Sequence, residues 1–135
     1  MRLVRDARHV PESLHSGVVA LGNFEGAHRG HQAVIAAARE IAHETGTPLL
    51  VLTFTPHPRE FFHPHLAPLR IYPLSKKIKF LRQLGVNALV LQRFNAAFAQ
   101  LPPHEFIDGI LVRALNAHHI VTGESFVFGK GREGN

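Results

Sequence analysis

The chain has 135 residues, 45% of them hydrophobic, and a formal net charge of +5 when its histidines are neutral. This length suits one α/β domain with a buried core and argues against two domains. The apolar runs are too short to cross a bilayer, and residues 1–17 lack the continuous apolar segment of a signal peptide. We therefore expect a cytoplasmic protein without a membrane partner. The absence of cysteine excludes disulfides, thiolate metal sites and thiol nucleophiles.

The basic residues indicate what kind of partner the chain binds. Lys and Arg number 15 against 10 Asp and Glu, and this excess favours an anionic partner. Apart from "KKIK" at 76–79 the basic residues are scattered, and they do not alternate with aromatic residues as in single-stranded nucleic-acid binding. We predict a small phosphorylated ligand and no nucleic acid.

The first elements after the N-terminus form a strand, a helix and a second strand. Residues 17–24, "GVVALGNF", are typical of a buried parallel strand that ends in a turn. Residues 31–46 have apolar positions at helical spacing, and Gly46 ends the pattern. Residues 47–58, "TPLLVLTFTPHP", predict another buried strand, closed by prolines. Together they predict a β-α-β unit.

The rest of the chain continues this alternation. Residues 59–73 are rich in proline and histidine and predict a surface loop. Helices are predicted over 74–85 and 102–116, each followed by a strand, at 86–92 and at 117–123. The predicted fold is therefore α/β, a Rossmann-like parallel sheet flanked by helices, with ligands at the carboxyl ends of the strands.

The glycine-rich C-terminus differs from the earlier strand exits. Residues 123–135, "GESFVFGKGREGN", lead into no helix, whereas each earlier strand is followed by one. We therefore expect the fold to be incomplete at its C-terminus, with one sheet face or edge partly uncovered.

The segment 22–32, "GNFEGAHRGHQ", carries the strongest chemical signal. Gly22, Gly26 and Gly30 allow a sharp turn and a close approach of the backbone to a phosphate. The predicted helix would present free N–H groups and a partial positive charge at the same place. His28 and His31 are three residues apart, so on a helix they share one face and can donate to a single phosphoryl group.

Two other interpretations of the histidine pair stay open. His28 and His31 could cap or pack the helix start, which the pattern alone makes as probable as phosphate binding. They could also form half of a zinc site, although no His-Glu-x-x-His arrangement and no cysteine supports it.

Four stretches together resemble a known family. The segment 22–32 resembles the Gly-x-Phe-Asp-Gly-x-His-x-Gly-His signature of nucleotidyltransferases with a His-x-Gly-His motif. The stretches "TFTPHP" at 53–58, "KIKFLRQLGV" at 77–86 and "TGESFVFGKGREGN" at 122–135 are similar to the flavin branch of that superfamily. This branch is the adenylyltransferase, or FAD synthetase, domain of the prokaryotic bifunctional riboflavin kinase/FMN adenylyltransferase.

The resemblance implies a reaction and a set of site residues. The reaction is transfer of AMP from ATP to FMN, giving FAD and pyrophosphate, with Mg²⁺ as cofactor. Apart from the resemblance, the sequence leaves the oligomeric state open, and we favour a monomer. His28 and His31 are implied as the catalytic residues, and the ligands of the metal stay unassigned. The implied ATP-binding residues are Gly22, Asn23, Phe24, His28, Gly30 and His31. The implied flavin-binding residues are Phe54, Pro56, His57, Pro58, Ser125, Phe126 and Phe128.

The chain departs from the family pattern in three respects. Glu25 replaces the usual aspartate, and Ser125 replaces an aspartate or asparagine. The chain also stops before the second nucleotide-binding motif, Ile-Ser-Ser-Thr-x-Ile-Arg, and before the riboflavin kinase domain. We therefore expect residues 1–135 to be a truncated adenylyltransferase domain without kinase activity. Two alternatives remain: a nucleotide- or flavin-binding fragment that does not catalyse, and a related nucleotidyltransferase with another phosphorylated acceptor.

Overall fold

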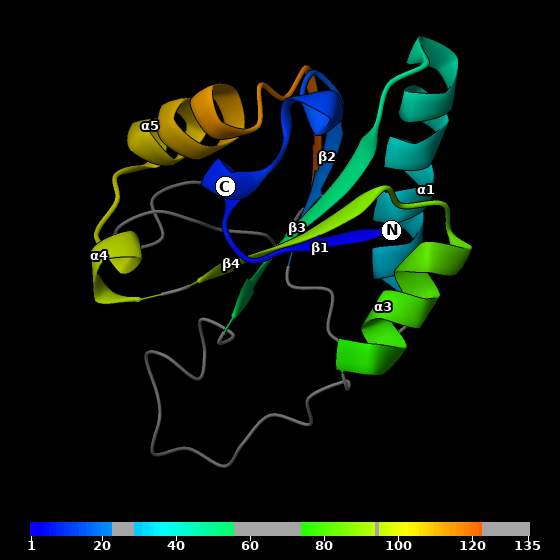
Figure 1. Cartoon of the computed structure of the whole chain (residues 1–135), viewed down its shortest axis with the longest axis horizontal. Helices are drawn as coiled ribbons and strands as arrows, with labels where there is room; N and C mark the ends of the chain where they lie inside the picture. Colours follow the sequence, from blue (N-terminus) through cyan, green and yellow to red (C-terminus); the bar gives the residue numbers. More distant parts are fainter. Residues whose placement is uncertain (23–28, 56–73, 94, 123–135) are drawn as a thin grey trace.

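Five parallel strands form a single sheet at the centre of the molecule. The structure, a computed structural model, describes residues 1–22, 29–55, 74–93 and 95–122. Across the sheet the strands follow the order β1-β4-β3-β2-β5 (Figure 1). Their bounds are Arg2–Val4 (β1), Val18–Leu21 (β2), Leu49–Thr55 (β3), Ala88–Arg93 (β4) and His119–Thr122 (β5). Because all pairings are parallel, the carboxyl ends lie on one edge of the sheet, here called the carboxyl edge, opposite the amino edge.

Helices cover both faces of this sheet. In Figure 1, α1 and α3 lie on one side, and α5 with the N-terminal turns lies on the other. The α-helices are α1 (Arg29–Thr45), α3 (Leu74–Gln83), α4 (Ala96–Ala99) and α5 (Pro103–Glu105), and α5 continues as a π-helix, η3 (Phe106–Ala114). Two 3₁₀ turns, η1 (Ala7–His9) and η2 (Glu12–Leu14), precede β2. This arrangement confirms the predicted α/β fold with helices on both sides of a parallel sheet.

The face under α1 and α3 has its own apolar core. Alternate residues of the central strands point toward it, and α1 and α3 cover them with buried aliphatic side chains. The core consists of Val18, Ala20, Ile35, Ala38, Ala42, Leu49, Val51, Leu81, Val86, Leu89 and Leu91. The predicted apolar face of the second helix is confirmed, since Leu74, Ile78 and Leu84 pack against this core beside buried Leu81.

The opposite face carries a second core under η1 and η3. It consists of Val4, Ala7, Val10, Val19, Leu21, Leu50, Leu52, Phe54, Ala88, Val90, Phe106, Ile110, Leu111 and Leu115. Both faces of the central strands are therefore buried, which explains why these strands are continuous apolar runs without polar alternation.

The predicted β-α-β unit is confirmed, with α1 between two adjacent parallel strands. Gly46 follows α1 with a φ of +66°, the left-handed conformation of a helix C-terminal glycine. The predicted strands at 86–92 and 117–123 correspond to β4 and β5. The loop predicted at 59–73 lies outside the described residues.

Two features differ from the sequence-based expectation. The strand β1 was not predicted, because it has three residues and only Val4 among them is buried, which is too short for a periodic pattern. The predicted helix at 102–116 is wound as a π-helix over most of its length, and the N–H of Leu115 donates to the carbonyl of Ile110, five residues earlier, at 3.1 Å. The predicted apolar face still meets the sheet, since Phe106, Ile110 and Leu111 are buried in the second core.

The close contact between Gly17 and Pro48 gives a test of this packing. The carbonyl of Pro48 accepts a hydrogen bond from Val18 N–H at 2.9 Å, and a Cβ on Gly17 would clash with that same oxygen. Gly17→Ala should therefore separate the start of β2 from β3 and lower the free energy of unfolding by about 2 kcal/mol.

Urea unfolding of the two variants Gly17→Ala and Gly109→Ala measures this effect against a control. A Cβ on Gly109, in η3, would meet no atom within 4 Å, so its alanine variant should be neutral or more stable by about 0.5 kcal/mol. Equal stabilities for the two variants would contradict the contact.

Candidate functional site

The carboxyl ends of three neighbouring strands define the candidate site. Leu21, at the end of β2, is the register partner of Leu52 on one side and of Thr122 on the other. The N–H of Gly22 donates to the carbonyl of Leu52 at 3.2 Å, so the chain is still held to β3 as it leaves β2. The central strand β2 thus ends between β3 and β5.

The motif-bearing segments start from these three strand ends. Residues 22–32 follow β2, residues 53–58 begin in the last part of β3, and residues 122–135 begin at the end of β5. The strand order reverses here, because the helix after β2 lies on one face and the helix before β5 lies on the other. Ligands of parallel α/β sheets bind at such a reversal, outside the carboxyl ends.

The amino end of α1 lies at the same edge. The helix begins at Arg29, seven residues after Gly22, and runs back along the sheet toward the amino edge. Its first turn, which includes Gly30 and His31, offers backbone N–H groups without intrahelical partners and the positive end of the helix dipole. This backbone arrangement suits an anion such as a phosphate.

The structure describes some of the predicted site residues. Gly22, Gly30, His31 and Phe54 lie at the carboxyl ends of β2 and β3 and in the first turn of α1. The others lie outside the described residues, and their roles stay predictions: Asn23, Phe24, His28, Pro56, His57, Pro58, Ser125, Phe126 and Phe128.

Phe54 is buried at the carboxyl edge, with 7% of its surface exposed. Its ring packs against the ring of Phe106 in η3, with centroids 6.2 Å apart and planes tilted by 45°. On β4 its register partner is Gln92. The predicted flavin-side residue therefore belongs to an aromatic pair that joins β3 to the π-helix.

A cavity of about 870 Å³ opens at the carboxyl ends of β1 and β4. Gln92 and Arg93 of β4, Asp6 and Arg8 of the segment after β1, and Gly109 and Ile110 of η3 are among the residues that line it. We call it the carboxyl-edge cavity. Its volume falls in the range of small-molecule sites, about 300–1,000 Å³.

Gln92 is the functional candidate that sequence reasoning missed. Its side chain is 4% exposed, and its Oε1 accepts a hydrogen bond from Ala7 N–H at 3.0 Å. The available signal was a polar residue at the end of the apolar run "ALVL", since a buried amide requires partners.

Asp6 and Arg8 form an ion pair at the rim of the same cavity. Asp6 Oδ1 accepts from the backbone N–H of Arg8 at 2.9 Å, and Oδ2 accepts from Arg8 Nη2 at 2.9 Å. The side-chain hydrogen bond from Arg8 is the main cause that lowers the pKa of Asp6 from 3.8 to about 2. The carboxylate is therefore ionised at neutral pH and caps η1.

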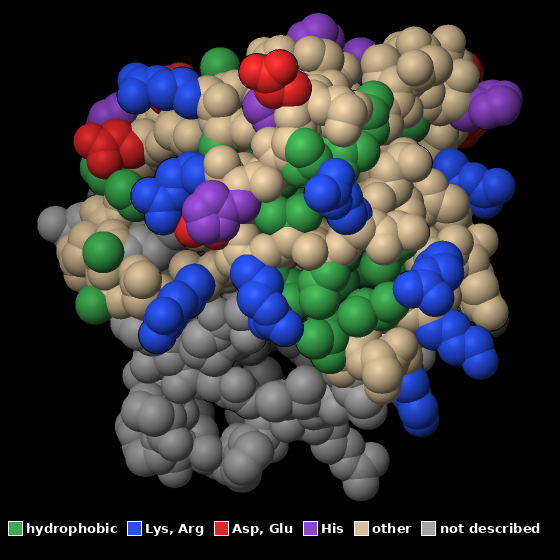
Figure 2. All heavy atoms as spheres, viewed as in Figure 1, with side chains coloured by type: hydrophobic (Ala, Val, Ile, Leu, Met, Phe, Trp, Pro, Cys, Tyr) green, Lys and Arg blue, Asp and Glu red, His purple; other side chains and the backbone are tan. Residues whose placement is uncertain are grey.

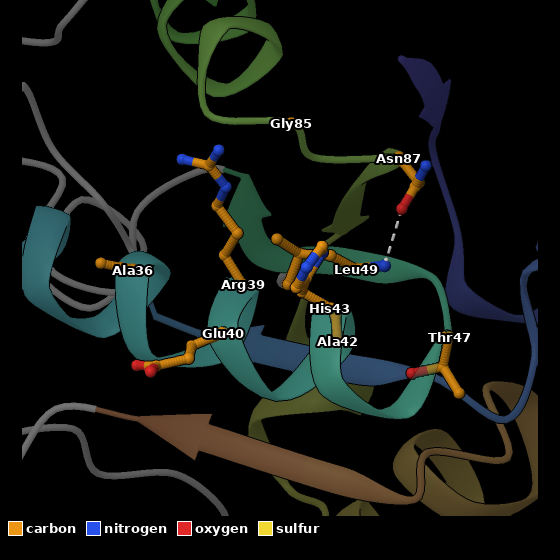
Figure 3. Close-up of a pocket in the computed structure, with 10 residues that line it drawn as sticks. Ala36, Arg39, Glu40, Ala42, His43, Thr47, Leu49, Gly85 and Asn87 are labelled. Atoms are coloured by element: carbon orange, nitrogen blue, oxygen red, sulfur yellow. Dashed lines mark hydrogen bonds between the residues drawn. The ribbon is translucent and has the colours of Figure 1, made fainter.

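A second cavity, of about 640 Å³, lies at the amino edge between α1 and the turn before β4. Figure 3 shows Arg39 and His43 of α1 beside it, and Asn87 Oδ1 accepting from Leu49 N–H at 2.8 Å. None of the described residues predicted for the site lines either cavity. The carboxyl-edge cavity is instead related to the site through Gln92, which lines it and is the register partner of Phe54.

The part of the chain that the structure describes holds no group of three or more His, Cys, Asp or Glu side chains placed to bind a metal ion. Of the helices described, none combines the length and apolar character needed to cross a lipid bilayer.

Comparison with known proteins decides the family. The family model of FAD synthetase matches residues 10–135. This chain belongs to the FAD synthetase family. The order of its motifs, and the start of three of the four at the carboxyl edge, agree with that membership.

Relatives of this FAD synthetase family member are named bifunctional riboflavin kinase/FMN adenylyltransferase. The protein of Pseudomonas fluorescens is 43% identical over 137 residues, covering 100% of this chain and 43% of its own length. That of Bacillus subtilis is 42% identical over 126 residues, covering 93% of this chain and 40% of its own. That of Escherichia coli K12 is 35% identical and covers 100% and 44%. The chain thus spans less than half the length of these relatives.

A solved structure shares the fold. A crystal structure described as a macrolide-efflux protein from Streptococcus pneumoniae superposes with a TM-score of 0.77 at 29% identity. It covers 98% of this chain, which covers 43% of that one. The likeness supports the architecture of the FAD synthetase family member described above.

The Asp6–Arg8 pair predicts a pH dependence of stability. Because the folded-state pKa of Asp6 is below its ordinary value, the stabilisation is present above pH 3.8 and is lost as the pH falls toward 2. Since Arg8 is largely exposed, we expect Asp6→Asn to cost about 1 kcal/mol of unfolding free energy at pH 7 and less below pH 3.8.

Denaturant unfolding of wild type and Asp6→Asn at several pH values measures the difference. Asp108→Asn changes an exposed carboxylate of η3 in the same way and serves as the control. A wild-type advantage over Asp6→Asn that stays constant down to pH 2 would contradict the ion pair.

Proposed function

We propose that this chain is an FMN adenylyltransferase domain that transfers AMP from ATP to FMN, giving FAD and pyrophosphate. One observation carries the proposal. The three segments 22–32, 53–58 and 122–135, which resemble the family, start from adjacent strand ends, where Leu21 pairs with both Leu52 and Thr122. Membership of the FAD synthetase family and the names of the relatives support the same reaction.

We assign the whole of residues 1–135 to this adenylyltransferase domain and none of them to a riboflavin kinase domain. The family match over residues 10–135 supports the assignment. The relatives carry both activities in their names, and this chain spans less than half of their length. The transfer of AMP is therefore the activity proposed for this part.

The ATP phosphates would bind at the amino end of α1. The turn residues Gly22, Asn23, Phe24 and Gly30 would shape the backbone around them. A phosphate oxygen of FMN would attack the α-phosphorus of ATP, forming a new P–O bond while the bond to the β-phosphate oxygen breaks and pyrophosphate leaves. His28 and His31 would donate to phosphate oxygens and stabilise the negative charge that develops during this displacement.

The flavin would lie beside the nucleotide, toward β3 and β4. Phe54, at the end of β3, supports this position, because it packs on Phe106 next to the carboxyl-edge cavity. The remaining flavin-side residues of the proposal are Pro56, His57, Pro58, Ser125, Phe126 and Phe128. Aromatic rings and small polar groups suit a planar heterocycle.

Mg²⁺ belongs to the proposal as the ion that accompanies ATP. Because the described residues form no cluster of metal-binding side chains, they do not fit a dedicated protein site, and no residue is assigned to the ion. Magnesium in nucleotide enzymes is held largely by substrate phosphates and water.

We further propose a cytoplasmic monomer that does not bind nucleic acid or membrane. Figure 2 supports the part on nucleic acid, since Lys and Arg side chains are spread over the visible face without forming one continuous stripe. The net charge of +5 then serves small anionic substrates.

The proposed reaction predicts a selective effect of His31→Ala. FAD formation should slow by about 100-fold or more, because one donor to the transition state is lost, while FMN affinity should change by less than about threefold. The measurement follows FAD by chromatography with ATP, FMN and Mg²⁺, and FMN binding by the quenching of flavin fluorescence.

His43→Ala is the matched control, because His43 is an exposed histidine near the other end of the same helix. It should leave both quantities unchanged. Equal losses of turnover and of FMN binding in His31→Ala would favour a packing role for His31. Binding of ATP and FMN without formation of FAD, or turnover of another phosphorylated acceptor, would contradict FMN adenylyl transfer by this chain.

A further inference from the structure

The two polar atoms of the buried Gln92 amide differ in their hydrogen bonding. Its Oε1 is held by Ala7 N–H at 3.0 Å, which fixes the orientation of the amide. Its Nε2 has no hydrogen-bond partner among the residues that the structure describes, although the side chain is 4% exposed. Because a buried N–H₂ left unpaired costs about 1–3 kcal/mol, this group is suited to an acceptor that enters the carboxyl-edge cavity.

The amide lines the carboxyl-edge cavity, which has room for a ligand. The side chain lies on the face of the second core, as those of Ala88 and Val90 do, and Ile110 of η3 adds an apolar wall. Gly109 also lines the cavity, and a Cβ there would meet no atom within 4 Å. Runs of π-helix are frequent at functional sites, and here one borders the cavity.

The distribution of charge in this cavity indicates which part of a ligand reaches Gln92. Gln92 is neutral and buried, whereas none of the Asp, Glu and Arg side chains that line the cavity is buried: Asp6, Arg8, Arg93, Glu105, Asp108 and Arg113. A phosphate held at Gln92 would be desolvated without a buried cation, which is costly. A neutral carbonyl oxygen on a ring satisfies the amide without that cost.

The position of Gln92 also fits a ligand that extends along the sheet edge. The strand β4 is separated from β2 by β3, so the two carboxyl ends are about 10 Å apart. A ring at β4 with its phosphate tail directed toward β2 would bring that phosphate to the amino end of α1. The aromatic pair of Phe54 and Phe106 lies between these positions.

We infer that Gln92 is a specificity-determining residue that donates from Nε2 to a carbonyl oxygen on the pyrimidine edge of the FMN ring. This inference rests on the proposed function, because it presumes that FMN is the acceptor. The dimethylbenzene edge of the ring has no hydrogen-bond acceptor, so Gln92 fixes which edge of the flavin enters the carboxyl-edge cavity.

Replacing the donor while keeping the acceptor tests the role of Gln92. Gln92→Glu retains an oxygen for Ala7 N–H but removes the amide donor. The FMN dissociation constant, measured by fluorescence quenching on the full chain, should rise by about tenfold. Gln83→Glu makes the same change at an exposed position at the end of α3 and should leave the FMN dissociation constant unchanged.

A change on the ligand tests the same contact without altering the protein. FMN in which the C2 or the C4 carbonyl is replaced by a thiocarbonyl, a weaker acceptor, should bind the wild-type chain several-fold more weakly at one of these positions. This penalty should disappear in Gln92→Leu. A thermal unfolding control shows whether Gln92→Glu and Gln92→Leu fold. If either does not, the affinities of the wild-type chain for FMN and for the two analogues test the contact.

Two results would overturn the inference, and they are distinguishable from failure of the proposed function. Equal FMN affinities in wild type and folded Gln92→Glu, or no loss with either thiocarbonyl analogue, would remove Gln92 from flavin recognition while FMN binding stands. A wild-type chain that binds ATP but no FMN would overturn the flavin acceptor itself, and the inference with it.

Discussion

The placement of β2 between β3 and β5 is the constraint on which the candidate site depends. Parallel pairing aligns the three carboxyl ends, with Leu21 opposite both Leu52 and Thr122. Any sequence that follows these strands must therefore start from neighbouring points about 5 Å apart. Residues that are a hundred positions apart in the chain become contributors to one edge, and α1 adds its amino end there.

The two faces of the sheet contribute differently to this edge. The face under α1 and α3 supplies a helix that starts at the carboxyl edge, which suits phosphate groups. The other face supplies the carboxyl-edge cavity between β4, η1 and η3, where Gln92 joins the end of β4 to Ala7. A molecule with a phosphate at one end and a flat ring at the other matches this pair of features, the amino end of α1 and the carboxyl-edge cavity.

Much of the fold could be predicted, because strands that are buried on both faces of the sheet consist of continuous apolar residues. The runs at 18–21 and 49–52 are wholly apolar, and the helix over 31–46 repeats its apolar positions with Gly46 at its end. The strand β1 could not be predicted, because three residues carry no periodicity. The π-helix could not be predicted either, since the spacing of its buried residues fits an α-helix equally well.

The sequence could propose a site where chemistry is local, as in the segment 22–32 with its glycines and histidines, and the roles of these residues stay predictions. The carboxyl-edge cavity could not be predicted, because its walls include residues of η1, β4 and η3, and only the folded chain brings them together. Gln92 shows the difference: the sequence marks it as a polar residue in an apolar run, but the hydrogen bond that orients its amide comes from Ala7, 85 residues away.

The most direct test of the central claim is a map of amide chemical shifts, by two-dimensional NMR, as FMN and then ATP are added to the chain. The account predicts that the perturbed amides belong to the carboxyl edge, including Gly22, Gln92 and Thr122, and to the first turn of α1. Perturbations that instead gather around Asn87 and His43, at the amino-edge cavity, would contradict it.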